Sequence, residues 1–225
     1  MMPIKHAKAR FQAVIFDLDG TLLDTLEDIA DSMNAALARM GLPAHPVQAF
    51  RYLTGDGVYQ LAQKSLPVNR RDETIIQDCI KAFRGEYRLR WANKARPYDG
   101  IPALLDELTA RGLKLSILSN KLDEFTNLIA EKILANWKFS FVMGTRPDVP
   151  RKPDPAGALI IARELGFAPD RFLYLGDTDT DMRTAVAAGM SAVGALWGFR
   201  DERELIEGGA QALIASPLEL LKFLD

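Results

Sequence analysis

The apolar residues of this chain repeat with two different periods, and the change of period divides the sequence into regions. A short unbroken apolar run, Ala13 to Phe16, predicts a strand buried on both faces, because half-exposed strands alternate instead. Short stretches rich in apolar residues predict further strands at 113–118, 139–143, 171–175, 192–196 and 212–214, separated by helices that begin near residues 101, 125, 155, 178, 201 and 217. This alternation predicts an α/β fold, a Rossmann-like three-layer core whose mostly parallel sheet is covered on both faces.

The stretch from Thr25 to about Trp91 shows helical spacing only, and no strand is predicted there. Its first helix is predicted to begin with a capping box made by Thr25 and Asp28. Its last helix is the clearest, since the apolar residues between Ile75 and Tyr87 line one face. We therefore predict a helical domain, residues 24–92, inserted into a core formed by residues 1–23 and 93–225.

Composition limits the partners and the cellular compartment that we expect for the protein. The chain has 225 residues, of which 48% are hydrophobic and 26% charged, and its net charge of −2 implies no general attraction to nucleic acid or to an anionic membrane. No apolar run is long enough to span a bilayer, and Met1 to Arg10 lacks the apolar stretch of a signal peptide. The single cysteine, Cys79, lies among isoleucines and is predicted to be a buried thiol. A reducing cytoplasm is the expected compartment.

The first predicted strand ends in two carboxylates, Asp17 and Asp19, separated by Leu18. Side chains two apart in an extended chain point the same way, so both acids can reach one small volume. Like charges held that close need a cation between them or a proton on one of them. Gly20 allows a sharp turn, after which the backbone N–H groups of Gly20 and Thr21 could face an anion. The plainer interpretation is a surface loop in which Asp and Gly are ordinary turn residues.

Three later segments place polar residues in comparable positions. Ser119 and Asn120 follow a predicted strand, Lys152 lies in a proline-rich loop, and Asp177 ends another strand with Asp181 four residues later. Each segment alone could be a turn, a solvated lysine or a helix cap. Because the carboxyl ends of parallel strands meet at one edge of a sheet, we expect these residues to share one crevice.

These four segments occur in the order found in the haloacid dehalogenase-like hydrolases, which the chain resembles. Within that superfamily, nearly all residues from Phe11 to Leu221 resemble the phosphoglycolate phosphatase group. The segments that carry this closer resemblance are Thr54–Gly57, Arg96–Ile101, Ser119–Lys121, Arg151–Pro155 and Trp197–Arg200. The chain departs from that pattern at Ser119, Leu122 and Asp179, and none of these departures removes a catalytic group.

The resemblance implies a role for each acid. Asp17 is the expected nucleophile, and Asp19 the general acid that then serves as base for water. Mg²⁺ is the expected cofactor, held by Asp17, by the backbone carbonyl of Asp19, by Asp177 and, directly or through water, by Asp181. The acid at Asp19 favours phosphoryl transfer over dehalogenation. The expected phosphate-binding residues are Gly20, Thr21, Ser119, Asn120 and Lys152.

The helical insert resembles the helical type of cap domain of this superfamily, which closes over the crevice and contacts the leaving group. The loop from Thr54 to Gly57 is expected to point at the site, with Gly55 and Gly57 as possible specificity residues. Arg51 either holds a substrate anion or is a plain surface arginine.

The function predicted from these features is a Mg²⁺-dependent phosphatase acting on a small phosphate ester, with 2-phosphoglycolate as the first candidate. The motifs leave open a phosphomutase of the β-phosphoglucomutase type and a hydrolase of sugar phosphates, nucleotides or pyrophosphate. A phosphate-binding protein without activity is a third interpretation. A monomer or homodimer is expected, with neither nucleic acid nor membrane as a partner.

Overall fold

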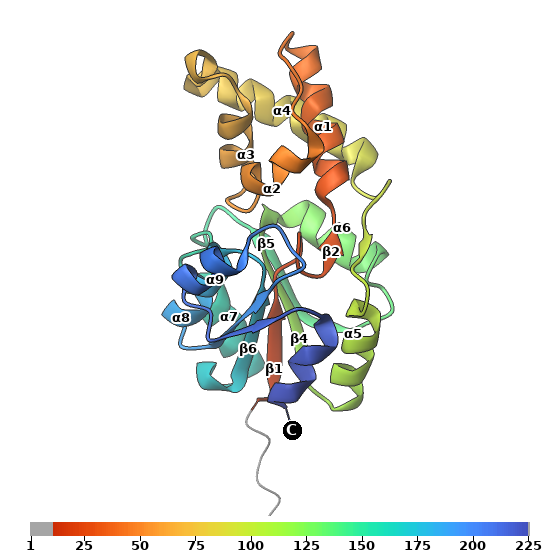
Figure 1. Ribbon diagram of the computed structural model, residues 1–225, viewed down its shortest axis with the longest axis vertical. Coiled ribbons are helices and arrows are strands. Elements are labelled where there is room, and N and C mark those ends of the chain that lie inside the picture. The colour runs from red at the N-terminus through yellow and green to blue at the C-terminus, as the bar shows by residue number, and fades with distance from the viewer. Residues whose placement is uncertain (1–10, 225) are drawn as a thin grey trace, which may run out of the picture.

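The computed structural model describes residues 11–224 as a sheet-based core that carries a helical lobe (Figure 1). The core consists of β1 (Ala13–Phe16), α5 (Ile101–Ala110), β4 (Lys114–Leu122), α6 (Asp123–Lys132), β5 (Phe139–Thr145), α7 (Ala156–Leu165), β6 (Phe172–Gly176), α8 (Asp179–Ala187), β7 (Ser191–Ala195), α9 (Glu202–Gly208), β8 (Ala212–Ile214) and 3₁₀ helices at Pro169–Arg171 and Pro217–Phe223. The helical lobe consists of α1 (Leu26–Arg39), α2 (Phe50–Leu53), α3 (Val58–Ser65), α4 (Glu73–Arg90) and 3₁₀ helices at Val47–Ala49 and Val68–Arg70.

The core sheet has the strand order β5-β4-β1-β6-β7-β8, and every neighbouring pair is parallel. Strand β1 lies between β4 and β6, with Val14 opposite Leu115 on one side and Leu173 on the other. Parallel neighbours end at the same edge, so the residues that follow β1, β4 and β6 are brought together.

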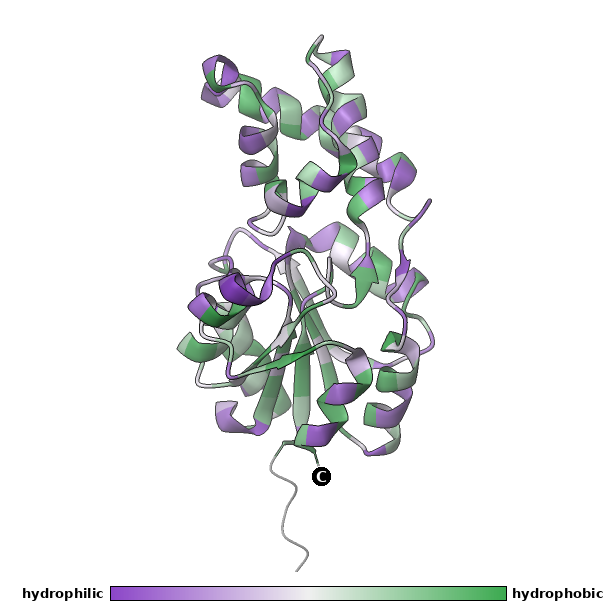
Figure 2. Ribbon diagram, in the orientation of Figure 1, coloured by the Kyte–Doolittle hydropathy of each residue, from purple (hydrophilic) through white to green (hydrophobic). Residues whose placement is uncertain are grey.

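Successive residues of β1 point into two different apolar clusters, one on each face of the sheet. Val14 and Phe16 pack with residues of α5 and α6, whereas Ala13 and Ile15 pack with residues of α7, α8 and α9. All four β1 side chains are buried, as predicted for a strand covered on both faces. Figure 2 shows the same arrangement, with hydrophobic strands inside and polar residues on the outer helix surfaces. The predicted three-layer α/β core is thereby confirmed.

The helical lobe is inserted through a short antiparallel ribbon formed by β2 (Leu23–Asp24) and β3 (Arg96–Pro97). The sequence did not predict these strands, because two residues are too few to show a period. The ribbon lies close to the predicted domain boundaries at 23/24 and 92/93, which stay a prediction. Helix α1 packs along α4, and the lobe, called the cap below, has its own apolar cluster.

Cys79 of α4 is buried in the cap cluster, as predicted. Burial raises the pKa of its thiol to about 11, so the group is a neutral packing residue at ordinary pH. No helix among residues 11–224 is long and apolar enough to cross a bilayer. The expectation about Met1 to Arg10 lies outside the described residues.

Two details of the predicted elements were wrong. The strand predicted at 113–118 continues to Leu122, because Leu122 pairs with Thr145 of β5 after an irregularity in the register. Thr25 makes no capping hydrogen bond to α1, and Asp28 instead accepts from the amides of Lys94 and Ala95. The Thr25 hydroxyl donates to Asp19, so a tertiary contact replaces the expected local one.

Candidate active site

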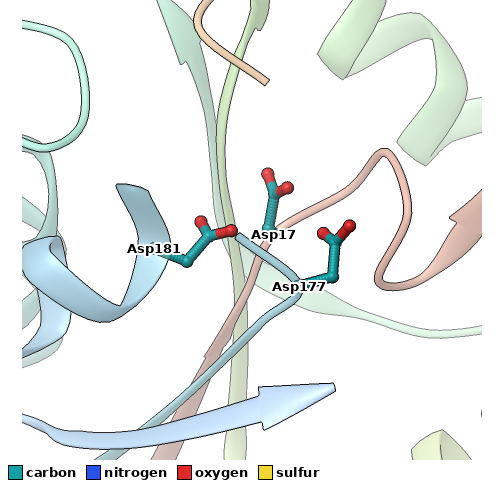
Figure 3. Close-up of side chains that lie close together, drawn as sticks. All are labelled: Asp17, Asp177 and Asp181. Atoms are coloured by element: carbon teal, nitrogen blue, oxygen red, sulfur yellow. The ribbon is translucent and has the colours of Figure 1, made fainter. Parts of the chain in front are cut away.

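Three buried acids meet at the carboxyl edge of the sheet (Figure 3). Asp17 follows β1, Asp177 follows β6, and Asp181 lies in the first turn of α8. One carboxylate oxygen from each lies within 4.8 Å of those of the other two. The convergence expected from the strand ends is therefore present.

Among residues 11–224, Lys152 is the basic residue that forms ion pairs with this acid cluster. Its Nζ lies 2.8 Å from Asp17 Oδ1 and 2.7 Å from Asp181 Oδ1. The side chains of Lys152 and Asp181 are 3% and 0% exposed, so water does not screen this pair. Three carboxylates against one ammonium leave an excess of two negative charges when all are ionised.

The pKa values of the acids reflect this excess. Burial, and then the charges of Asp181 and Asp177, raise the pKa of Asp17 well above its usual range, although Lys152 opposes the shift. Burial and the charge of Asp181 raise the pKa of Asp177 to about 7. Burial alone would lower the pKa of Lys152, but Asp17 and Asp181 raise it well above its usual value, so the lysine stays charged.

A divalent cation fits this cluster. Mg²⁺ prefers oxygen ligands, and its charge would balance the two uncompensated negative charges. Asp17 and Asp177 would gain from such a cation, because burial penalises their charged forms. Asp181 Oδ2 already accepts from the hydroxyl and amide of Thr178 in a capping box, which fixes the orientation of this carboxylate. Coordination by the backbone carbonyl of Asp19 stays a prediction.

Gly20 leaves the space that Asp177 occupies. Its φ is +89°, and a Cβ there would lie 2.3 Å from Asp177 Oδ2. The Thr21 hydroxyl donates to Asp177 Oδ1 at 2.8 Å, so the turn after Asp19 both admits and holds this acid.

Replacing Gly20 with alanine is therefore expected to lower the free energy of unfolding by about 2–4 kcal/mol, the sum of a left-handed backbone and a clash with a buried group. Gly41→Ala is the matched control, since φ is +68° at Gly41 but nothing lies within 4 Å of its Cβ position. It should cost only about 1 kcal/mol. Denaturant unfolding of both variants measures the difference. Equal losses of unfolding free energy in the two variants would show that the close approach of Asp177 to Gly20 does not affect stability.

Asp19 is held by two residues to which the sequence analysis gave no such role. Lys121 Nζ lies 2.8 Å from both oxygens of Asp19, and the Thr25 hydroxyl donates to Oδ1 at 2.7 Å. Lys121 also lies 4.7 Å from the centroid of the Tyr87 ring. The position of Lys121 directly after Ser119-Asn120 was the only signal in the sequence, and it did not indicate which acid the ammonium would meet.

The expected phosphate-binding residues differ in how their donors are engaged. The amides of Gly20 and Thr21 donate to the carbonyls of Leu23 and Leu18, so they close the turn. Within residues 11–224, no hydrogen bond engages the amides of Leu18 and Asp19, which makes these the available donors next to Asp17. Phosphate binding by Gly20 and Thr21 through their amides stays a prediction that this geometry does not favour.

The other expected phosphate ligands lie at the end of β4. The Ser119 hydroxyl accepts from the Lys121 amide at 3.2 Å and keeps its proton available. The Asn120 side-chain amide donates to Gly55 O at 3.0 Å and to Lys152 O at 3.1 Å. Asn120 thus ties the cap loop and the lysine loop together, and a role for it in phosphate binding stays a prediction.

A cavity of about 60 Å³ extends from Asp17 and Asp19 to the cap. The predicted residues that line it are Asp17, Asp19, Gly55, Gly57, Ser119 and Asn120. Most of its remaining wall is apolar or aromatic, from cap residues such as Leu61, Phe83 and Tyr87 and from Phe125 of α6. A leaving group on a phosphate attached near Asp17 would occupy this space.

The loop between α2 and α3, which was predicted to point at the site, contributes Gly55 and Gly57 to the wall of the cavity, and a role in specificity stays a prediction. Gly55 and Gly57 have φ of +108° and +87°, and a Cβ on Gly57 would lie 3.2 Å from Asn120 O. Arg51 does not line the cavity. It donates instead to the carbonyls of Gly198 and Phe199, so neither interpretation of Arg51 anticipated its contacts.

Comparison with known proteins identifies the family and the fold. Residues 14–195 match the model of the family described as haloacid dehalogenase-like hydrolase. The chain is 32% identical over 215 residues to the phosphoglycolate phosphatase of Aquifex aeolicus, which covers 95% of this chain and 97% of that protein. It is 31% identical over 220 residues to the N-acetylmuramic acid 6-phosphate phosphatase of Pseudomonas aeruginosa, with 97% of each chain covered.

Solved structures agree with this result. A predicted phosphoglycolate phosphatase from Haemophilus somnus superposes with a TM-score of 0.87 at 25% identity, covering 97% of this chain and 100% of that one. A hydrolase from Pseudomonas syringae superposes with a TM-score of 0.77 at 27% identity, covering 96% and 98% of the two chains. The similarity therefore extends over both the core and the helical lobe.

Proposed function

The chain belongs to the haloacid dehalogenase-like hydrolases, and we propose that it is a Mg²⁺-dependent phosphatase of a small phosphorylated metabolite. The observation that carries the proposal is the meeting of Asp17, Asp177, Asp181 and Lys152 in one buried cluster. This cluster adjoins a cavity that also contains Asp19. A binding site for phosphate alone would not need a second acid in that position.

In the first half-reaction, a carboxylate oxygen of Asp17 attacks phosphorus while the bond to the leaving oxygen breaks. Asp19 gives its proton to that oxygen, and an aspartyl-phosphate remains on Asp17. Asp19 then takes a proton from water as the water oxygen attacks phosphorus, which releases inorganic phosphate and restores both acids. Bound Mg²⁺ supplies the positive charge that lets two anions approach each other.

The remaining residues hold these groups in place. Lys152 orients Asp17 and supplies fixed positive charge to the phosphoryl oxygens. Lys121 and Thr25 hold the Asp19 carboxyl group on the cap side, where a leaving oxygen would arrive. The amides of Leu18 and Asp19 and the hydroxyl of Ser119 donate to the phosphoryl oxygens. The cap excludes bulk water during both steps.

We propose 2-phosphoglycolate as the first substrate to test, because several relatives at about 30% identity carry that name. N-acetylmuramic acid 6-phosphate is the second, from the relative in Pseudomonas aeruginosa. A cytoplasmic location stays a prediction.

Phosphate release from a metabolite panel tests the proposal. With Mg²⁺ we expect the highest kcat/KM for 2-phosphoglycolate, and an activity that EDTA lowers by at least about 100-fold and added Mg²⁺ restores. The panel should include N-acetylmuramic acid 6-phosphate, nucleotides, pyrophosphate and a hexose 1-phosphate with its bisphosphate. Turnover that survives metal removal would contradict the metal-dependent mechanism. Isomerisation of the hexose phosphate faster than phosphate release would indicate a mutase.

A further inference from the structure

The loop Trp197–Arg200, between β7 and α9, contacts the acid cluster on one side. The Phe199 amide donates to Asp177 Oδ2 at 2.7 Å. Trp197 Nε1 donates to the carbonyl of Thr21 at 3.0 Å, and the Thr21 hydroxyl donates to the other oxygen of Asp177. A Cβ on Gly198 would lie 2.2 Å from the Cβ of Asp177, so the loop backbone packs directly against this acid. The loop therefore fixes where the Asp177 carboxylate lies.

The same loop contacts the cap on its other side through two arginines that reach in opposite directions. Arg51 of α2 donates through Nε to Phe199 O at 3.2 Å and through Nη2 to Gly198 O. Arg200 donates through Nη2 to Thr54 O at 3.0 Å and through Nη1 to Arg51 O. Arg200 is buried, and the Phe199 side chain, 2% exposed, belongs to the apolar cluster of the cap.

A single peptide group connects the cap to Asp177. The carbonyl of Gly198 and the N–H of Phe199 belong to the same peptide unit; the carbonyl accepts from the Arg51 guanidinium, and the N–H donates to the Asp177 carboxylate. A cation bound at the carbonyl polarises the peptide and makes its N–H a stronger donor to an anion. Arg51 thus acts on Asp177 in two ways: it fixes the plane of the Gly198–Phe199 peptide, and it strengthens the hydrogen bond from the Phe199 N–H to the Asp177 carboxylate.

Lifting the cap from this position would break all of these contacts together. Arg51 and Arg200 would lose backbone acceptors, and the Phe199 ring would leave an apolar cluster for water. The loop that holds Asp177 would then lose its support on the cap side. The position of the cap and the orientation of one acid of the metal cluster are therefore mechanically linked.

We propose that Arg51 and Arg200 are positioning residues that couple cap closure to metal binding through the Gly198–Phe199 peptide. A closed cap orients Asp177 for the cation, and by linkage a bound cation stabilises the closed cap. The proposal goes beyond the phosphatase activity and takes from it only the Mg²⁺ site at Asp17, Asp177 and Asp181.

Titration of the full-length protein with Mg²⁺ in the absence of substrate tests this coupling without measuring activity. We expect Arg51→Ala to raise the dissociation constant for Mg²⁺ about 10-fold, which is in the range of typical couplings between two sites. Arg51→Lys should recover part of that loss, since an ammonium can still donate to one carbonyl. The matched control is Arg84→Ala, which removes an ion pair of 2.8 Å between α4 and Glu124 of α6, remote from the loop. It should bind Mg²⁺ within about 2-fold of the wild-type protein.

Hydrogen exchange supplies a second measurement, which can be made on the wild-type protein alone and then compared with Arg51→Lys. Mg²⁺ is expected to slow amide exchange in residues 50–57 and 197–200, and Arg51→Lys should show a smaller change. Three results would each overturn the coupling. Arg51→Ala could bind Mg²⁺ as tightly as the wild-type protein, or Arg84→Ala could lose as much affinity as Arg51→Ala. The third is an amide exchange rate in residues 50–57 that does not change when Mg²⁺ is added. If Arg51→Ala does not fold, Arg51→Lys and the wild-type exchange still decide the matter. A wild-type protein that binds no Mg²⁺ would instead contradict the metal site and the proposed function.

Discussion

Asp17→Asn is expected to lower phosphate release by about 10⁴-fold or more, because the variant lacks the attacking carboxylate. The substitution keeps the size of the side chain, so the cavity and the backbone of β1 should be unchanged. It also removes one of the two carboxylates that Lys152 contacts, at 2.8 Å. The loss should therefore appear in kcat for every substrate, since the same nucleophile serves them all.

Steady-state phosphate release with saturating Mg²⁺ measures this effect, and circular dichroism checks the fold. Asp179→Asn is the matched control: Asp179 lies in the same Asp-rich segment as Asp177 and Asp181, but it pairs with Arg183 and is not part of the cluster. It should retain activity within about 3-fold, since this partly exposed pair within one helix contributes little. More than a tenth of the wild-type activity in Asp17→Asn would exclude Asp17 as the nucleophile.

Lys152→Met is expected to lower both activity and stability. Methionine has a similar length without the charge, so three acids would share one buried cluster with no ammonium among them. Removing one partner of a buried ion pair costs about 3–5 kcal/mol of unfolding free energy, because the other charges are left uncompensated. The loss of a fixed positive charge at the phosphoryl group should reduce kcat by about 10²–10³-fold.

Denaturant unfolding in EDTA and in Mg²⁺ separates these effects. We expect Mg²⁺ to restore part of the lost stability in Lys152→Met, because it supplies positive charge to the same acids. Lys222→Met is the control, since Lys222 is exposed and pairs with Glu219 in the same turn. That variant should change stability by less than about 0.5 kcal/mol. An equally small change in Lys152→Met would show that the cluster does not depend on the lysine.

Much of the core could be predicted because its evidence is local. The unbroken apolar run of β1 already indicated burial on both faces, and its alternate side chains do enter two separate clusters. The polar residues Asp17, Ser119 and Asp177 each follow or end an apolar run, so a parallel sheet had to bring them to one edge. The helices of the cap could also be predicted from the sequence, since apolar positions in α1 and α4 recur at helical spacing.

Side-chain partners were harder to predict than elements. Thr25 followed by Asp28 has the spacing of a capping box, yet Thr25 donates to Asp19 and Asp28 accepts from the amides of Lys94 and Ala95, where the chain returns from the cap to the core. The local motif lost to tertiary contacts whose residues are up to 67 positions away. Propensity rules describe a residue among its chain neighbours, so they fail where a distant group offers a better acceptor or donor.

The sequence by itself determined the alternation of strands and helices, the helical insert and the edge of the sheet where the acids meet, because each follows from a short period or from the rule that parallel strands end together. Only the tertiary structure decided which groups face each other: Lys121 meets Asp19 across 102 positions, and Arg51 reaches Phe199 across 148. Such pairs form where two separately folded elements approach within a hydrogen-bond length. That approach is set by the packing of the whole sheet and cap, and no window of neighbouring residues contains it.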